Sequence, residues 1–314
     1  MEFLYFLEGI RNSVLDTVML IITSLGEETV FMLVAMFTLW CVDKYEGYYI
    51  LFTGFIGTQL NQLLKVCFRI ERPWVRDPKF KAVEGAIEEA TGYSFPSGHT
   101  QSSVGTFGAL ARWNKNKPLR IICIALCILI PFSRMYLGVH TPMDVITSVI
   151  IALILVFLLY PLIRRFAEKP NGMRIMLALM AVWSVAQILF MEFYKFPISA
   201  DAEQLSSGLK NAYKMLGAVL GVIIAYELDI RFINFQTKAV WWAQLLKLIL
   251  GIALTLAVKE LCYAVFSFIP HAAASRAFSY FFMVIFAGFV WPCTFKFFSK
   301  LSNSGKTPKQ PQKQ

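Results

Sequence analysis

The chain has 314 residues, of which 57% are hydrophobic and 16% charged, and its formal net charge at pH 7 is +10. Soluble domains hold about a quarter charged residues, and a water-surrounded core of this size would not bury the 28 Phe residues present here. The composition therefore excludes soluble globular, disordered and disulfide-stapled secreted proteins. It predicts an all-α, polytopic membrane protein, because a lipid bilayer is the solvent that accommodates the apolar excess.

Apolar runs of transmembrane character follow one another along the chain. They cover residues 3–25, 28–42, 48–67, 99–112, 119–138, 142–163, 173–194, 210–228, 239–260 and 276–298. The longer runs have about the 20 residues that a helix needs to cross the hydrocarbon core. Two runs fit less well. The first contains Arg11, Asn12 and Asp16 and is alternatively an interfacial helix, and the fourth is short unless neighbouring helices shield its start.

A change in composition at residues 169–172 (Lys-Pro-Asn-Gly) divides the runs that carry sequence motifs from the runs that do not. We expect residues 1–168 to form a six-helix core and residues 169–298 to form about four additional C-terminal transmembrane helices. Residues 299–314 are polar and rich in Pro and Gln, which predicts a disordered, basic tail.

Basic residues are concentrated on one side of the expected topology. That side holds the loops 43–47, 112–120, 164–174 and 229–238 and the tail from residue 296. Cytoplasmic loops carry an excess of Lys and Arg, so this side, with the C-terminal tail, is predicted to be cytoplasmic. The opposite side, extracytoplasmic or lumenal, receives the loop 68–98 and the turn 138–142. Nucleic-acid binding does not explain the charge, because no soluble basic domain is present to carry it.

The first motif, Lys65-Val-Cys-Phe-Arg-Ile-Glu-Arg72-Pro73, closes the third expected helix. Pro73 prevents the helix from continuing, so Lys65 and Arg72 lie on either side of its end. Basic residues at the end of a membrane helix are commonly headgroup anchors whose side chains reach toward the interface. Taken alone, this motif favours that simple interpretation.

The second motif, Pro96-Ser97-Gly98-His99, opens the fourth expected helix. Backbone N–H groups at a helix start point toward one position, and together with the helix dipole they form a site for an anion such as phosphate. Gly98 allows a ligand to approach the backbone closely. The alternative is an ordinary Ser cap followed by a histidine without a function.

The third motif, Ser133-Arg134-Met-Tyr-Leu-Gly-Val-His140-Thr-Pro-Met-Asp144, joins the end of one expected helix to the start of the next. Thr141 and Asp144 have the spacing of a capping box, with Pro142 at the first helical position. Asp144 can also accept a hydrogen bond from the Nδ1–H group of His140 and so fix the tautomer of the ring. The two roles do not exclude each other.

Together, the pattern K-x6-RP, then PSGH, then SR-x5-H-x3-D resembles the signature of the type 2 phosphatidic acid phosphatase superfamily. That superfamily includes lipid phosphate phosphatases, bacterial undecaprenyl-diphosphate phosphatases, glucose-6-phosphatase and vanadium haloperoxidases. Every signature position is matched without substitution. The resemblance covers about residues 13–163, and the C-terminal helices fall outside it.

The resemblance implies hydrolysis of a phosphate ester through a phosphohistidine, and the residue types agree with that chemistry. His140 is the candidate nucleophile, and Asp144 would hold its other ring nitrogen and stabilise the positive charge that develops. His99 is the candidate general acid, which protonates the leaving oxygen and then activates water.

Cations and backbone N–H groups are expected to hold the non-bridging phosphate oxygens. These cations and N–H groups belong to Lys65, Arg72, Ser97, Gly98 and Arg134. Asp144 is the only carboxylate among the predicted site residues, and the six cysteines lack the spacing of metal ligands. The sequence therefore predicts an enzyme without metal or other cofactor.

The expected substrate is a membrane lipid phosphate, whose head would dock at the helix ends while its chains remain in the lipid bilayer. The motifs do not separate monophosphates from diphosphates, and nothing in the sequence predicts an oligomeric state. A lipid phosphotransferase using the same site is one alternative. A lipid transporter or scramblase with a headgroup-binding site is another, although simple binding does not need a paired His and Asp.

Overall fold

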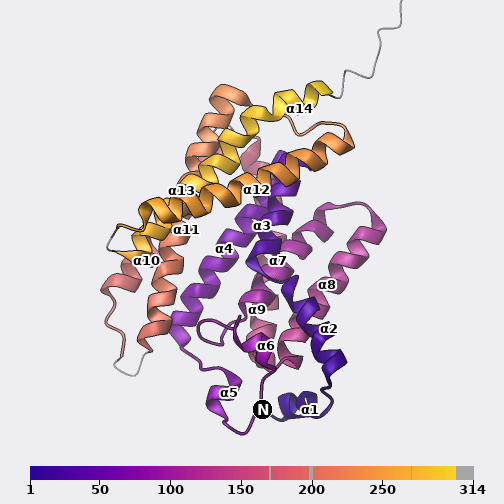
Figure 1. The fold of residues 1–314 in the computed structure, drawn as a ribbon, viewed down its shortest axis with the longest axis vertical. Coiled ribbons are helices and arrows are strands. Elements are labelled where there is room, and N and C mark those ends of the chain that lie inside the picture. The colour runs from indigo at the N-terminus through magenta and orange to yellow at the C-terminus, as the bar shows by residue number, and fades with distance from the viewer. Residues whose placement is uncertain (170, 198–200, 270, 302–314) are drawn as a thin grey trace, which may run out of the picture.

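The computed structural model describes residues 1–169, 171–197, 201–269 and 271–301, and every regular element in these ranges is a helix (Figure 1). The N-terminal elements are α1 (Glu2–Gly9), α2 (Ser13–Ser24), α3 (Glu28–Phe37), η1 (Thr38–Val42), α4 (Lys44–Phe68), α5 (Pro73–Arg76), α6 (Glu84–Ile87), α7 (Gly98–Trp113), α8 (Lys117–Tyr136) and α9 (Pro142–Ala167). The C-terminal elements are α10 (Gly172–Phe193), α11 (Ala202–Leu228), η2 (Asp229–Ile233), α12 (Trp241–Phe266), α13 (Ala272–Ile285), η3 (Phe286–Val290), η4 (Trp291–Thr294) and α14 (Phe295–Leu301). The predicted all-α class is confirmed.

Several helices are long and apolar enough to cross a membrane. Single helices that meet this description are α8, α9, α10, α12 and the continuous segment from α13 to α14. The chain is therefore an integral, multi-pass membrane protein, as the composition predicted. The more polar long helices α4, α7 and α11 all contribute residues to the large cavity described below.

The first two apolar runs do not form two separate spans. Helices α2 and α3 are bent by 46° at a short break, and the pair meets the length and apolarity of a membrane span only when it is taken as one broken segment. The sequence left open whether the first run spans or lies in the interface, and in the structure this run is continued by the second as one bent pair. Helix α1 is a separate short helix at the end of the bundle where α5 lies (Figure 1).

The polar residues that interrupt the first run have protein partners instead of lipid headgroups. Arg11 Nε donates to the carbonyl oxygen of Tyr136 at 2.9 Å, and the Tyr136 hydroxyl donates to Asp16 at 2.9 Å. The side chain of Asn12 caps α2 by accepting from the Leu15 N–H group. These contacts fasten α1 and α2 to the end of α8.

Helix α7 lies between α4, α8 and α9 and is the centre of the core. Small side chains such as Ser103, Gly105 and Thr106 allow the neighbouring helices to approach it closely. Its first turns are buried, so the short fourth run is shielded by other helices, which was the condition for its insertion. Burial also fixes the position of the residues at its N terminus.

The four predicted C-terminal helical segments are present and pack against the core. Helix α11 packs mainly against α13, and also against α10 and α4. At one end, Lys44 Nζ lies 2.5 Å from the buried Asp229 carboxylate, and this ion pair joins α4 to η2. Lys247 of α12 is fully buried, and its ammonium donates to the carbonyl oxygen of Trp40 at 2.7 Å.

The first residues of the predicted tail are helical and not disordered. Helix α14 continues to Leu301, so residues 299–301 are helical. Residues 302–314, the rest of the predicted tail, lie outside the described residues.

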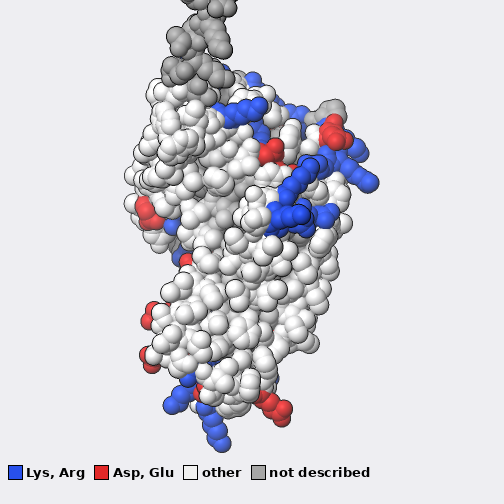
Figure 2. Space-filling model, turned by 90° about the vertical axis from the view of Figure 1, so that its right-hand side faces the viewer, with Lys and Arg blue, Asp and Glu red and all other residues white. Residues whose placement is uncertain are grey.

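Charged side chains mark the two ends of the molecule. Figure 2 shows Lys and Arg gathered on the upper part of one face, with a broad uncharged stretch between them and the charged lower tip. The exposed Lys115 follows the C-terminal end of α7, whereas the loop that holds α5 and α6 leads into the N-terminal end of that helix. Which end faces the cytoplasm stays a prediction.

The orientation predicts which exposed lysines face each side. In a chain whose six cysteines are replaced by serine, Lys115→Cys is expected to react with a membrane-impermeant maleimide only from the cytoplasmic face. Lys79→Cys, in the loop at the other end, is expected to react in intact cells. Reaction of Lys115→Cys in intact cells would contradict the orientation.

The close approach of α11 and α13 predicts a large effect from one methyl group. A Cβ atom at Gly217 would overlap the backbone carbonyl of Ala277. We expect Gly217→Ala to lower the free energy of unfolding by about 1–3 kcal/mol, since backbone cannot move aside as a flexible side chain can. The control is Gly9→Ala, where a Cβ meets nothing within 4 Å. Equal thermal unfolding midpoints of the two variants in detergent would contradict the packing.

Candidate active site

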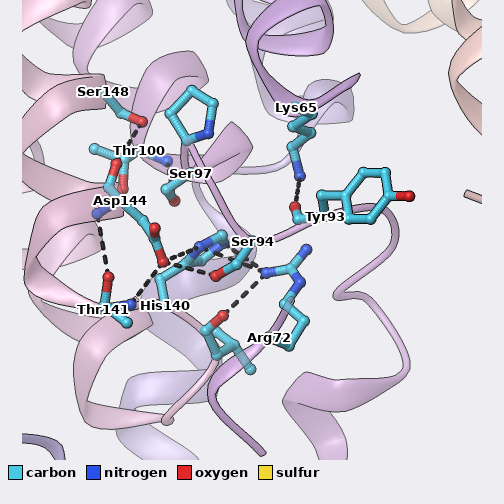
Figure 3. Close-up of polar contacts among 12 residues, drawn as sticks. Lys65, Arg72, Tyr93, Ser94, Ser97, Thr100, His140, Thr141, Asp144 and Ser148 are labelled. Carbon is cyan, nitrogen blue, oxygen red and sulfur yellow. Dashed lines mark hydrogen bonds and ion pairs between the residues drawn. The ribbon is translucent and has the colours of Figure 1, made fainter. Parts of the chain in front are cut away.

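The three sequence motifs meet at one end of the bundle. They come from the ends of α4 and α8, the starts of α7 and α9, and the loop between α4 and α7 (Figure 3). A cavity of about 430 Å³ lies between these elements. The predicted residues that line it are Lys65, Arg72, Gly98, His99, Arg134 and His140. Ser97 and Asp144, the other two predicted residues, are buried directly behind this lining.

His140 is held between the end of α8 and the start of α9 by Asp144. The Oδ2 atom of Asp144 lies 3.5 Å from His140 Nδ1, and it accepts hydrogen bonds from the Thr141 N–H group at 2.8 Å and the Ser94 hydroxyl at 2.7 Å (Figure 3). The capping box predicted for Thr141 and Asp144 is present. One carboxylate oxygen therefore caps α9 and also lies near the imidazole, and the role of Asp144 in fixing the tautomer of His140 stays a prediction.

The other ring nitrogen of His140 contacts Arg72. Arg72 NH1 lies 2.8 Å from His140 Nε2. A guanidinium only donates, so Nε2 accepts, and the Nδ1–H group faces Asp144. His140 is only 1% exposed. Burial, with the positive charges of Arg72, Arg134 and Lys65, holds the pKa of His140 well below its ordinary value. The ring is therefore neutral at neutral pH, and Nε2 keeps a lone pair.

Arg72 organises the backbone around the site as well. Its Nε donates to the Gly92 carbonyl at 3.1 Å, NH2 to the Thr91 carbonyl at 2.8 Å and NH1 to the Val139 carbonyl at 3.0 Å. Burial lowers the pKa of Arg72 to about 10, and at neutral pH the guanidinium remains charged. One cation thus joins the loop after α4 to the turn that carries His140.

Arg134 and Lys65 place further positive charge at the cavity. Lys65 Nζ donates to the Tyr93 carbonyl at 2.6 Å (Figure 3). Arg134 is 0% exposed, and its NH1 donates to the Thr23 hydroxyl at 2.9 Å. Its Nε and NH2 atoms have no hydrogen-bond partner among the described residues. Buried guanidinium donors without an acceptor, at the edge of a cavity, indicate a site for an anion.

The start of α7 differs in detail from the expected cradle of N–H groups. Ser97 caps the helix, its hydroxyl accepting from the Thr100 N–H group at 3.4 Å. The Ser97 N–H group donates to the Asp144 carbonyl at 3.2 Å, so it serves the protein and not a ligand. Gly98 and His99 line the cavity, and N–H groups in a first helical turn have no intrahelical partner.

His99 lies in the same cavity as His140. Its Nε2 atom has no hydrogen-bond partner within the described ranges and lies 3.9 Å from a carboxylate oxygen of Glu89. Glu89 follows α6 and also lines the cavity. The cavity thus contains a neutral, held histidine and a second histidine with a free ring nitrogen.

Sequence analysis missed several residues of the site. Ser94, which donates to Asp144, and Thr23, which holds Arg134, lie outside the motifs and have no distinguishing neighbours in the sequence. Glu89 belongs to a mixed-charge loop. Lys214 and Asn211 of α11 line the cavity from the C-terminal helices, for which the sequence offered no role.

Comparison with known families assigns both halves of the chain. Residues 45–168 match the PAP2 superfamily, and this stretch contains every predicted site residue. Residues 213–304 match a second family, described as PAP2 superfamily phosphatase, transmembrane extension. The second match accounts for most of the C-terminal helices that the sequence motifs left unexplained.

Individual relatives are similar over about half of the chain. Undecaprenyl-diphosphatase BcrC of Bacillus subtilis (strain 168) is 29% identical over 165 residues, which is 50% of this chain and 81% of the relative. A probable sphingosine-1-phosphate phosphatase of Dictyostelium discoideum is 28% identical over 160 residues, 47% of this chain and 38% of the relative. Sphingosine-1-phosphate phosphatase 1 of Mus musculus is 26% identical over 150 residues, 45% of this chain and 33% of the relative.

No solved structure matches the chain significantly. The assignment depends on the two family matches, which together include the site and its C-terminal neighbour α11 from residue 213 onward. The motif positions predicted from sequence fall inside the first match and meet around one cavity in the fold. This chain belongs to the PAP2 superfamily.

Proposed function

We propose that this protein is a membrane lipid phosphatase that hydrolyses a lipid phosphate or diphosphate through a covalent intermediate on His140, without a metal ion. The observation that carries the proposal is a neutral histidine, backed by Asp144, in a cavity where Arg134 directs unpartnered donors. Nucleophile, orienting carboxylate and anion-binding cation are then present in one place.

In the first step, Nε2 of His140 attacks phosphorus, and the bond from phosphorus to the leaving oxygen breaks. The hydrogen bond that Arg72 NH1 makes to Nε2 is exchanged for one to a phosphate oxygen, which frees the lone pair. Asp144 stabilises the positive charge that develops on the ring. His99 gives its proton to the leaving oxygen, and the negative charge of the bound phosphate favours the protonated form of His99.

In the second step, water hydrolyses the phosphohistidine. His99, now neutral, takes a proton from water, and the hydroxide oxygen attacks phosphorus. The phosphorus–nitrogen bond breaks, and the electron pair returns to Nε2 of His140. Inorganic phosphate leaves, and His99 regains the proton with which it began the cycle.

The cavity supports a lipid substrate because its lining changes along its length. The site residues lie at the helix ends, while Phe31 and Met215 line the same cavity farther along α3 and α11. A phosphate head can lie among the cations while the apolar part extends toward the bilayer. The names of the relatives, which are an undecaprenyl-diphosphatase and sphingosine-1-phosphate phosphatases, support a lipid substrate as well.

The mechanism predicts that His140 is indispensable. We expect His140→Asn to lower kcat for phosphate release from lipid phosphates by about four orders of magnitude, since the nucleophile and the covalent intermediate are lost together. Rapid-quench labelling with a radioactive substrate should trap phosphoprotein in the parent chain and not in this variant.

The matched control is His271→Asn, because His271 is the third histidine of the chain and lies at the start of α13, outside the cavity lining. It should retain full activity. Phosphate release by purified His140→Asn at the parental rate would disprove the nucleophile assignment. The transporter alternative would be favoured if the parent chain transports lipid without phosphatase activity and His140→Asn still transports it.

The proposal also predicts activity without divalent metal. In the part of the chain that the structure describes, no group of three or more His, Cys, Asp or Glu side chains is arranged to hold a metal ion. Turnover in excess EDTA is expected to stay within about twofold of the untreated enzyme, since cations of the protein neutralise the phosphate. Loss of activity on chelation, with recovery on adding Mg²⁺, would contradict this mechanism.

A further inference from the structure

The cavity continues beyond the residues that the mechanism uses. On α4, the lining residues Lys65, Gln62, Thr58 and Gly54 fall on successive turns. The lining therefore changes from a cation through an amide and a hydroxyl to bare backbone over about 16 Å along the helix. Between the catalytic end and the apolar end, the cavity has a polar middle section.

The opposite wall of this middle section belongs to α11, a helix of the C-terminal extension. Asn211, Lys214 and Met215 of α11 line the cavity. The PAP2 match covers residues 45–168, and the match to the transmembrane extension begins at residue 213, so Lys214 and Met215 belong to the extension and Asn211 directly precedes it. The extension thus contributes directly to the substrate cavity, in addition to packing against the core.

Lys214 is the charged residue of this wall. It is 8% exposed, its Nζ lies 2.6 Å from an oxygen of Glu28, and the ring of Tyr280 lies 5.2 Å away. An ammonium has three N–H donors, and Glu28 accepts one of them. The carboxylate keeps the lysine charged. An ionised side chain within a membrane protein is costly and, where it faces a cavity, generally serves a function.

Gln101 of α7 provides an independent indication that a polar ligand belongs here. It is 4% exposed and lines the same cavity. Both its amide oxygen and its amide nitrogen lack a hydrogen-bond partner among the described residues. A buried amide with neither atom satisfied is unfavourable unless something else occupies the cavity and bonds to it.

We propose that α11 adds a second anion subsite to the active site, centred on Lys214 and completed by Gln101 and Asn211. Its ligand is the second phosphate of a lipid diphosphate. The inference rests on the proposed function, because it assumes that the terminal phosphate lies beside His140. The second phosphate joins the terminal one to the lipid, so it must lie between the catalytic residues and the apolar end. Lys214 and Gln101 occupy that section.

The Lys214–Glu28 contact explains why the subsite suits an anion and not a lipid amine. Glu28 already has a cationic partner, so an amine entering here would meet the like charge of Lys214. The other acids of the lining, Glu27 and Glu89, lie on the catalytic side, where both act on Arg134. An incoming phosphate would accept hydrogen bonds from the two N–H groups of Lys214 that do not bond to Glu28.

The test compares two substrates that differ only in the second phosphate, farnesyl diphosphate and farnesyl monophosphate. In Lys214→Gln, the ratio of kcat/KM for the diphosphate to kcat/KM for the monophosphate is expected to fall about tenfold, as for a lost hydrogen bond to a charged group. Lys214→Arg should keep the ratio. Lys210→Gln removes the same charge one turn earlier, at a residue outside the cavity lining, and should also keep it.

An unchanged ratio in Lys214→Gln, or an equal fall in Lys210→Gln, overturns the subsite. If the parent chain hydrolyses neither lipid, the proposed function fails, and the subsite is decided by calorimetry on the purified full chain in detergent. The parent chain should then bind inorganic pyrophosphate more tightly than orthophosphate, and Lys214→Gln should lose this preference. Equal affinities in the parent chain overturn the subsite independently of catalysis.

Discussion

The site depends on one buried cation, Arg72. Its guanidinium bonds to carbonyl groups of the loop after α4 and of the turn before α9, and it contacts Nε2 of His140. These segments are far apart in the sequence and share no helix, so the guanidinium joins them, together with the bonds from Val83 to Leu137 and from Ser94 to Asp144. Burial, together with this charge, lowers the pKa of the His140 imidazole. A lysine could not replace it, since a single ammonium lacks the planar set of donors that reaches three carbonyls and a ring nitrogen at once.

Sequence reasoning reached the catalytic side of the cavity because the chemistry there needs particular residue types at fixed helix ends. His140, Asp144 and Arg134 are closely spaced in one motif, and the short turn between α8 and α9 keeps them near one another. Ser94 and Thr23 escaped notice because a hydroxyl in an apolar run or a loop gives no periodic signal. Their partners, Asp144 and Arg134, come from other helices. Such contacts depend on packing, which no local pattern encodes.

The helix bounds were predicted best where the length of an apolar run determines the length of the helix. Helices α8, α9 and α10 follow their apolar runs closely. The first two runs could not be resolved from the sequence, because hydropathy measures apolar length and not direction. A break of three residues between α2 and α3 leaves the chain travelling roughly onward, bent by 46°, instead of turning back. Likewise, the role of α11 could not be predicted, because Lys214 is positioned by an ion pair with Glu28, which lies on a helix distant in the sequence.

The bend between α2 and α3 also has a consequence for the charge of the cavity. At Gly26 the backbone leaves the helix close to Ile130 and to the carbonyl of His99, and residues 26–29 line the cavity. The N–H groups of Leu25, Gly26 and Glu27 bond to carbonyl oxygens of α2, so the break leaves none of these three donors without a partner. A straight helix would carry successive residues around its axis to different faces. The bend instead places two consecutive acidic residues, Glu27 and Glu28, at the lining of one cavity.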